Sequence, residues 1–314
     1  MSITLGVLYL YYPDTDKYQK EKPMAALKKI IARLSCQAHI IYINNAASKD
    51  YVQQISDHEY EISGDNSSFE FSGWQKGLDF IKDKGLCCDA FLFANDMFLH
   101  DSLVDRWRIN DDALKGAIKY KAMVGKKAHL PVEGDIAGNE IMPYIRTHLF
   151  FVSATLMAAL GNIISVDRFL KDRLFIPSYE ASVPLFRPEA PLSSDLKDFI
   201  FHHVTSNWNR KKPYTRPHFD LLKGKAVSIL NACLLSIRAK QLGYPLISLS
   251  KAPKLLSRSL SLDEIDGLWY RGHHSHRPKI QASQERFWFS NSRIYRQLPK
   301  SKNFLKKFFS PNHL

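Results

Sequence analysis

An acid follows the apolar run Ala90 to Ala94, in the pair Asn95-Asp96, and this placement suits ligand binding. A buried strand that stops at an acid holds a carboxylate at the rim of a sheet. In open α/β sheets, ligands bind at this rim, outside the carboxyl ends of the strands. The sequence therefore predicts a binding site at the end of this strand.

Three earlier apolar runs also end in side chains that can contact a ligand. The aromatic pair Tyr11-Tyr12, the amides Asn44-Asn45 and the polar turn Gly64-Asp65-Asn66 each follow a predicted strand. These strands span Ile3 to Tyr12, His39 to Ile43 and Glu59 to Ile62. Strands that run in the same direction would bring all of these polar ends to one edge of the sheet.

The segments between the strands have the periodicity of amphipathic helices. Met24, Leu27 and Ile30 lie on one face of a predicted helix over Pro23 to Leu34. A second helix is predicted over roughly Ser72 to Lys84. The first hundred residues thus read β-α-β-(α)-β-α-β, with a tentative helix in the bracket. This order predicts a mixed, Rossmann-type α/β sheet that is mainly parallel and flanked by helices.

The rest of the chain is expected to add three more strands and a helical C-terminal part. Tyr144 to Val152 reads as a strand, and Ser153 is expected to cap the helix that follows it. Gly243 suits the end of the last long helix. The further elements expected are helices at Asp111 to Tyr120, Asp195 to Val204 and Leu221 to Leu242, and short strands at Ala122 to Val124 and Tyr244 to Leu249.

The charge is strongly positive and uneven. The net charge is +13 over 314 residues, and the segment from Arg286 to Leu314 holds seven Lys/Arg and no acid. A basic chain favours an anionic partner: nucleic acid, anionic lipid or a phosphorylated substrate. Phe304, Leu305, Phe308 and Phe309 lie among these cations, as in segments that bind anionic membranes; a solvated tail is the alternative.

Several familiar sites are excluded by the absence of their motifs. The chain has no GxGxxG, GxxxxGK[ST], GxSxG or HExxH pattern. No apolar run reaches the length of a membrane span. The N-terminus lacks the features of a signal peptide, and the four cysteines have no CxxC spacing. A cytoplasmic protein is expected, peripheral at the cytoplasmic face of the inner membrane.

The order of the strand ends resembles the nucleotide-sugar half of a GT-A fold glycosyltransferase. More narrowly, residues 1–160 resemble bacterial family 2-like transferases that build lipopolysaccharide and capsule chains. The resemblance rests on DNSSFEFSGWQKGL after the third strand, on Asn95-Asp96 after the fourth and on YIRTHLFF at Tyr144 to Phe151. It implies a GT-A-like fold, a nucleotide-sugar donor and a saccharide or glycolipid acceptor.

The resemblance also implies roles for individual residues. Asp96 would bind Mn²⁺ or Mg²⁺ that bridges the donor diphosphate, although the first acid of the usual DxD motif is Ala94 here. Arg146 and His148 flank Thr147 and would face the diphosphate or the acceptor. The residues expected to bind the donor are Tyr11, Tyr12, Asn45, Asp65, Asn66, Glu70, Trp74, Asn95, Arg146 and His148.

An inverting transfer needs a carboxylate base within hydrogen-bond reach of the acceptor hydroxyl. With Asp96 assigned to the metal, the candidates are Asp135 and Glu140, in the Gly/Pro-rich segment His129 to Pro143, and Glu180. The helix that resembles a family helix with a central acid reads Asn231-Ala232-Cys233 instead, so no base is carried over from it.

Simpler interpretations stay open for several of these residues. Tyr11 and Tyr12 can be core aromatics, and Asn66 can merely form a turn. Glu70 can be a solvated acid at the start of a helix. Trp74 can be core, because Leu78 and Ile81 share its helical face.

We therefore expect a hexosyltransferase that moves a sugar from a nucleotide sugar, UDP-hexose first, to a lipopolysaccharide or other surface-glycan acceptor. Residues 1–160 would form the donor half, 161–257 the acceptor-side helical part and 258–314 a basic segment that contacts an anionic membrane. A catalytically inactive scaffold and a nucleic-acid-binding protein are the alternatives. Nucleic acid is not expected as a partner, because most of the charge is in the tail and no recognition motif appears.

Overall fold

An eight-stranded sheet forms the centre of the computed structural model, which describes residues 2–13, 21–100, 103–177, 185–208, 219–258 and 260–270. The strand order is β10-β6-β9-β5-β1-β2-β4-β3. β9 and β3 run antiparallel to their neighbours, and the other pairs are parallel. The strands are β1 (Ile3–Tyr11), β2 (Cys36–Asn44), β3 (Val52–Ser56), β4 (Glu59–Ser63), β5 (Ala90–Asn95), β6 (Met123–Ala128), β9 (Tyr144–Ser153) and β10 (Leu246–Ser248).

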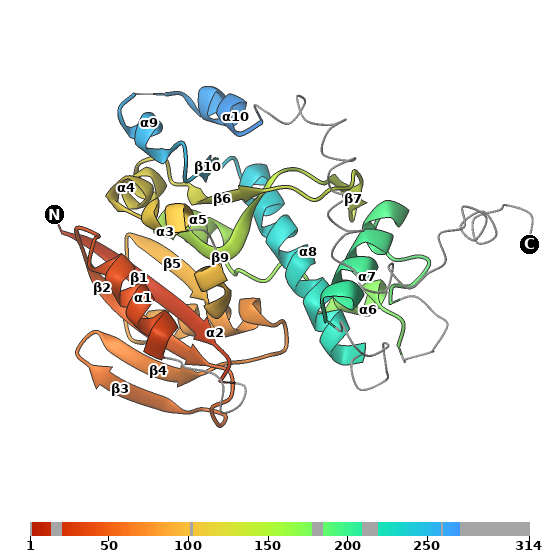
Figure 1. Cartoon of the computed structure of the whole chain (residues 1–314), viewed down its shortest axis with the longest axis horizontal. Helices are drawn as coiled ribbons and strands as arrows, with labels where there is room; N and C mark the ends of the chain where they lie inside the picture. The colour runs from red at the N-terminus through yellow and green to blue at the C-terminus, as the bar shows by residue number, and fades with distance from the viewer. Residues whose placement is uncertain are drawn as a thin grey trace, which may run out of the picture.

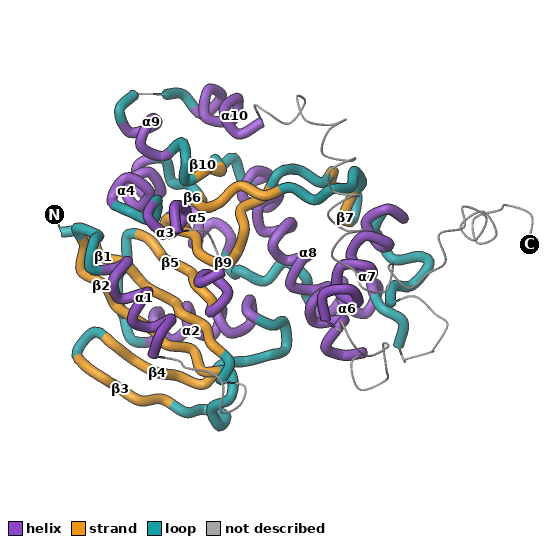
Figure 2. The backbone as a smooth tube through the Cα atoms, viewed as in Figure 1, coloured by secondary structure: helices purple, strands orange, loops and turns teal. Residues whose placement is uncertain are grey.

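Helices cover both faces of this sheet, and a helical part extends from one side of it (Figures 1 and 2). A two-stranded hairpin, β7 (Asp135–Ile136) with β8 (Asn139–Glu140), precedes β9. The helices are α1 (Glu21–Ile31), α2 (Glu70–Asp83), the 3-10 helix η1 (Asp96–His100), α3 (Leu103–Trp107), α4 (Asp111–Lys119), α5 (Ala154–Leu160), α6 (Arg168–Leu174), α7 (Ser194–Trp208), α8 (Phe219–Gln241), α9 (Ala252–Leu256) and α10 (Leu262–Tyr270).

Alternating side chains of the strands form a separate core on each face. On one face Tyr9 and Leu92 pack with Leu27 of α1 and Leu114 of α4. On the other face the strands pack against α2, α5 and the C-terminal half of α8. The N-terminal half of α8 packs instead with α6 and α7 in a third core. α8 therefore ties the helical part to the sheet.

The predicted α/β class, a mixed sheet flanked by helices with a helical C-terminal part, is confirmed. Ser153 caps α5 by accepting a hydrogen bond from the Leu156 N–H at 3.1 Å, as predicted. Gly243 follows α8 with φ of 80°, which suits a glycine. Every helix in the described ranges is too short or too polar to cross a bilayer.

Two predictions about elements are wrong. The tentative helix before β4 is the edge strand β3, which pairs antiparallel with β4. Its residues are all exposed, so its sequence carries no alternating pattern from which a strand could be recognised. The pattern also gave no element after Ser257, where the structure forms α10. The proposed membrane segment from Arg286 onward lies outside the described residues, as does Glu180.

Candidate active site at the carboxyl edge of the sheet

The four predicted strand ends do meet at one edge of the sheet. In the register of the sheet, Tyr11 of β1 pairs with Asn44 of β2, and Asn44 pairs with Ser63 of β4. On the other side of β1, Leu10 pairs with Asn95 of β5. β9 runs the opposite way, so its first residues lie at this same edge, beyond the end of β5. The fold thus gathers polar side chains where ligands bind in open α/β sheets.

The two aromatic residues at the end of β1 have different surroundings. Tyr11 is fully buried, and its hydroxyl donates to Glu61 Oε1 at 2.6 Å. Asn44 Nδ2 donates to the same oxygen at 2.9 Å. Tyr12 is 47% exposed. Tyr11 therefore helps to hold the edge together, whereas Tyr12 is open to a ligand.

The loop after β4 folds tightly around Asn45. A Cβ atom added at Gly64 would lie 1.7 Å from Asn45 Oδ1, so only glycine fits beneath this amide. Asn66 Nδ2 donates to the Asn45 carbonyl at 3.2 Å, and Asp65 Oδ1 accepts from the Ser67 N–H at 2.7 Å. Asp65 and Asn66 thus shape the loop, and both remain exposed beside the edge.

Two buried amide oxygens at this edge suggest contact with a ligand. The Oδ1 atoms of Asn45 and Asn95 have no hydrogen-bond partner among the described residues. Asn95 itself is only 6% exposed. A buried polar atom without a partner costs free energy, so such atoms in a native protein often mark a binding site.

Trp74 lies in the core and supports the end of β5. It is fully buried, and its indole N–H donates to the Ala94 carbonyl at 3.2 Å. Its ring also packs edge-on against Phe93 and Phe150. The structure therefore gives Trp74 a positioning role behind Asn95-Asp96, without direct access to a donor.

We expect Trp74→Phe to lower the free energy of unfolding by roughly 1–3 kcal/mol, because it removes a buried hydrogen bond and opens a small cavity. Affinity for nucleotide sugars should stay close to that of the wild type. Chemical denaturation and isothermal calorimetry measure the two quantities. A large loss of affinity at unchanged stability would show that the indole contacts the ligand.

An irregularity in β9 sets the direction of Arg146 and His148. Gly125 of β6 pairs with Phe150 of β9, and Lys127 pairs with Ile145. Between these two pairs β9 therefore contains more residues than β6. The extra residues of β9 bulge at the edge of the sheet, and Arg146 and His148 alternate with the buried Thr147. Bulges of this kind re-aim side chains and are frequent beside active sites.

Glu70 is the centre of an ionisable cluster between the sheet and the helical part. It begins α2, and its carboxylate accepts a hydrogen bond from the Ser228 hydroxyl of α8 at 2.6 Å. Burial raises the pKa of Glu70; the Ser228 hydrogen bond and the charges of His148 and Lys225 oppose this effect. Glu70 therefore contacts Ser228 of α8 and is close enough to His148 of β9 to feel its charge.

Two basic side chains near Glu70, Lys225 and His203, are also desolvated. Burial lowers the pKa of Lys225, an effect that Glu70 opposes. Burial also lowers the pKa of His203 on α7, and the charge of Lys225 lowers it further. Sequence patterns gave no reason to place Lys225, Ser228 or His203 near Glu70. Lys225 and Ser228 are three residues apart, on one face of a mostly apolar helix, which is the signal that could have identified them.

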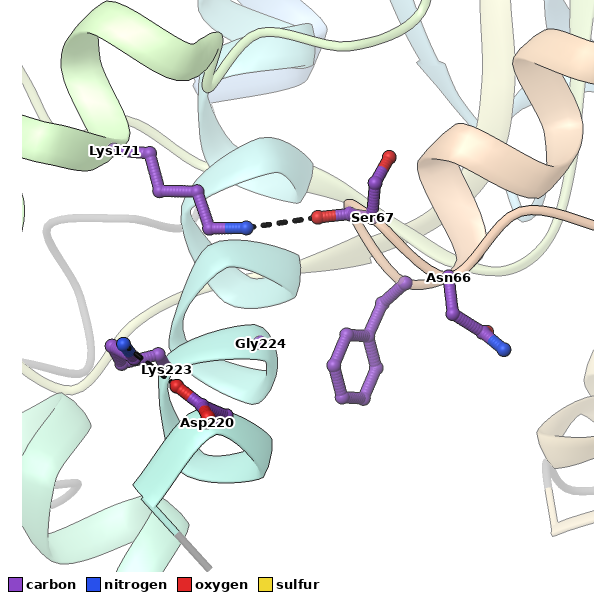
Figure 3. A pocket seen from close by; sticks show the side chains of 7 residues that line it. Asn66, Ser67, Lys171, Asp220, Lys223 and Gly224 are labelled. Atoms are coloured by element: carbon purple, nitrogen blue, oxygen red, sulfur yellow. Dashed lines mark hydrogen bonds and ion pairs between the residues drawn. The ribbon is translucent and has the colours of Figure 1, made fainter.

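A cavity of about 280 Å³ opens beside Phe69, the residue that directly precedes Glu70 in the chain (Figure 3). Lys171 of α6 closes one side by donating to the Ser67 carbonyl at 2.9 Å. Lys223 forms an ion pair with Asp220 at 2.7 Å on the other side. The lining residues are Asn66, Ser67, Phe69, Lys171, Asp220, Lys223 and Gly224. The cavity thus offers one aromatic ring with amide, hydroxyl and charged groups.

The predicted bases Asp135 and Glu140 lie in the β7-β8 hairpin. The Asp135 carboxylate accepts from the Gly138 N–H at 3.1 Å, which closes the hairpin turn. An isolated bridge joins Ile136 of the hairpin to Leu192. The structure therefore groups Glu70 with the edge and leaves Asp135 and Glu140 in the hairpin.

The side chains at the end of β5 can supply some of the ligands that a divalent cation needs. Asp96 supplies one carboxylate and Asn95 one amide, and in the described part of the chain no group of three or more His, Cys, Asp or Glu side chains converges. This set suits Mg²⁺ or Mn²⁺ held by one carboxylate together with substrate phosphates, and it does not suit a metal held by protein alone.

Comparisons with known proteins give little beyond this geometry. No protein-family model matches the chain, and no curated protein matches it. Among solved structures, the chain is similar to a mannosyltransferase from Pyrobaculum calidifontis in complex with GDP-mannose and Mn²⁺. The TM-score is 0.31 at 9% identity, over 94% of this chain and 88% of that one. With so low a TM-score, any function must be argued from this chain's own residues.

Proposed function

We propose that the protein is a glycosyltransferase that binds a nucleotide sugar along the carboxyl edge of the sheet and takes its acceptor from the cavity beside Glu70. The observation that carries the proposal is the position of Glu70. This half-buried acid directly follows Phe69 of the cavity wall and lies within electrostatic range of His148 at the edge of the sheet. A base placed between two binding regions is what transfer between two substrates requires.

The donor would lie across Asn45, Asn95 and Asp96. The two unpartnered amide oxygens suit hydrogen-bond donors of the nucleoside and sugar. Asp96 with a divalent ion, and Arg146 from the bulge of β9, suit the diphosphate. Bound there, Mn²⁺ or Mg²⁺ would neutralise the charge that develops on the leaving diphosphate.

The reaction follows from these positions. The acceptor hydroxyl oxygen forms a bond to the anomeric carbon as the bond from that carbon to the diphosphate oxygen breaks. Glu70 takes the hydroxyl proton, and the electron pair of the broken bond leaves with the nucleoside diphosphate. A carboxylate with a raised pKa suits this role, because its proton affinity is closer to that needed near neutral pH.

The acceptor is proposed to be a saccharide. Phe69 offers an aromatic face, and Asn66, Asp220 and Lys223 offer hydrogen bonds to hydroxyl groups. We propose UDP-hexose as the donor, and a lipopolysaccharide or another surface glycan as the acceptor. The basic chain suits a phosphorylated glycolipid at the cytoplasmic face of the inner membrane.

Nucleotide sugars should raise the melting temperature. At about 100 times the dissociation constant, a ligand adds about 2.7 kcal/mol, which corresponds to a shift of about 5 °C. The panel is UDP-, GDP- and CDP-sugars, each with and without Mn²⁺, measured by thermal shift. Asp96→Ala should remove the Mn²⁺-dependent part of the shift.

Asp83→Ala serves as the control for that variant, because it removes an exposed carboxylate at the opposite end of α2 from Glu70. No shift with any nucleotide sugar would contradict the proposed function. A shift with no product in a transfer assay would instead favour the inactive scaffold, which the missing first acid at Ala94 suggests.

A further inference from the structure

Four large apolar side chains that face solvent come from η1 and α3. Met97 is 45% exposed and Val104 56%, while Leu103 and Trp107 are each 65% exposed. None of the residues of α3 is buried. The other large exposed apolar residues in the described ranges occur singly or in pairs on separate elements. An exposed apolar group of this kind marks an interaction surface.

Basic side chains lie beside this group on α1. Lys22, Lys29 and Arg33 are spaced by seven and four residues, so they share one face of the helix and its C-terminal turn. Lys22 and Lys29 are exposed and form no ion pair with any described residue. Lys28 lies on a different face, where it pairs with Glu59 at 2.8 Å.

Arg33 joins the two groups into one surface. Its guanidinium lies 4.3 Å from the centre of the Trp107 ring, and its Nη2 donates to the Arg106 carbonyl at 3.1 Å. The acid of α3, Asp105, is neutralised by Lys126 at 2.6 Å. α1 and α3 lie over the same face of the sheet (Figure 1). We call this surface the basic-apolar face: Lys22, Lys29, Arg33, Met97, Leu103, Val104 and Trp107. Arg108, at its border, forms an ion pair with Asp105 at 3.7 Å.

We propose that the basic-apolar face docks on an anionic lipid bilayer. Its exposed Leu, Val, Met and Trp can enter the boundary between headgroups and acyl chains, where tryptophan is favoured. The surrounding Lys and Arg match the negative charge of the headgroups. This charge complementarity favours a bilayer over a second copy of this basic chain. The proposal does not depend on the transferase activity or on the segment from Arg286 onward.

The test uses the full chain and vesicles of phosphatidylcholine with and without phosphatidylglycerol. The variant Leu103→Ser/Val104→Ser/Trp107→Ser should bind the anionic vesicles at least about tenfold more weakly than the wild type. Val52→Ser/Ile55→Ser is the matched control, because these side chains are 55% and 47% exposed on the edge strand β3. Lys22→Glu/Lys29→Glu should weaken binding to the anionic vesicles and not to the neutral ones.

Tryptophan quenching distinguishes this face from the basic tail. Lipids brominated on their acyl chains should quench the wild type, and Trp107→Phe should lose most of that quenching, whereas Trp288→Phe should keep it. Quenching lost only with Trp288, or full vesicle binding by the triple variant, would overturn the proposal. So would a wild-type dimer in sedimentation that the triple variant converts to a monomer.

Discussion

Glu70→Gln is expected to slow sugar transfer by about a hundredfold or more without destabilising the fold. Glutamine keeps the shape of the side chain and can still accept the hydrogen bond from Ser228. It cannot take a proton from an acceptor hydroxyl. Because burial raises the pKa of Glu70, the protein environment favours a neutral group there, so glutamine should be tolerated. Steady-state kinetics and thermal unfolding measure the two effects.

The pH dependence of stability provides a second measurement. The folded state binds the Glu70 proton more tightly than the unfolded state does. The stability gained from this is fully present below the unfolded pKa and is lost as pH rises through the raised folded pKa. Glu70→Gln removes this titration. The variant should therefore lose less stability than the wild type as pH rises from mildly acidic to neutral.

Asp79→Asn is the control for charge, because Asp79 is an exposed acid on the same helix that only accepts from Gln75 at 2.9 Å. It should transfer sugar at the wild-type rate. If Glu70→Gln also transfers at that rate, Glu70 is not the base. A lower melting temperature for Glu70→Gln would then assign the cluster with Lys225 and His148 to holding α8 against the sheet.

The strands and helices of residues 1–160 could largely be predicted because their burial follows simple periods. β1, β2 and β5 are buried on both faces and read as continuous apolar runs, and α2 shows one apolar stripe. Polar residues mark the point at which each buried apolar run ends, so the carboxyl edge of the sheet could be predicted as well. β3 failed this test because both of its faces are exposed.

The cluster around Glu70 could not be predicted from local patterns. It forms from α2, α7, α8 and β9, and Glu70 and Ser228 are 158 residues apart. Nothing near Glu70 in the sequence shows that α8 will cover it. The direction of Arg146 and His148 depends on a register shift between β6 and β9, which no alternation of residue types reveals. The sequence predicted a Gly/Pro-rich loop for Asp135 and Glu140, and the structure pairs these two residues with each other in the β7-β8 hairpin.

Gly224→Ala is expected to lower both stability and transfer, although alanine normally favours a helix. A Cβ atom at Gly224 would lie 1.7 Å from the ring of Phe69, so the ring must move. Phe69 has φ of 54°, which is a strained value for a non-glycine residue, and it directly precedes Glu70. Moving its ring therefore disturbs the wall of the cavity and the start of α2.

Gly116→Ala is the matched control, since Gly116 is also inside a helix, and a Cβ atom there would meet only the Ala252 Cβ at 3.9 Å. Alanine is more favourable than glycine in a helix by about 1 kcal/mol, so Gly116→Ala should stabilise the protein by up to that amount. In Gly224→Ala this gain is opposed by overpacking, which costs about 1–3 kcal/mol. Denaturant unfolding should therefore show a higher free energy of unfolding for Gly116→Ala and a lower one for Gly224→Ala. At the least, Gly224→Ala should be clearly less stable than Gly116→Ala.

Adding Phe69→Ala to Gly224→Ala tests the cause directly. If the ring is what the new methyl group meets, the double variant should recover stability, and a double-mutant cycle should give a coupling energy of about 1 kcal/mol or more. Additive changes would show that the two residues do not contact each other. Recovery of stability without recovery of transfer would place the Phe69 ring in acceptor binding, because the cavity would then be restored in volume and lack only its aromatic face.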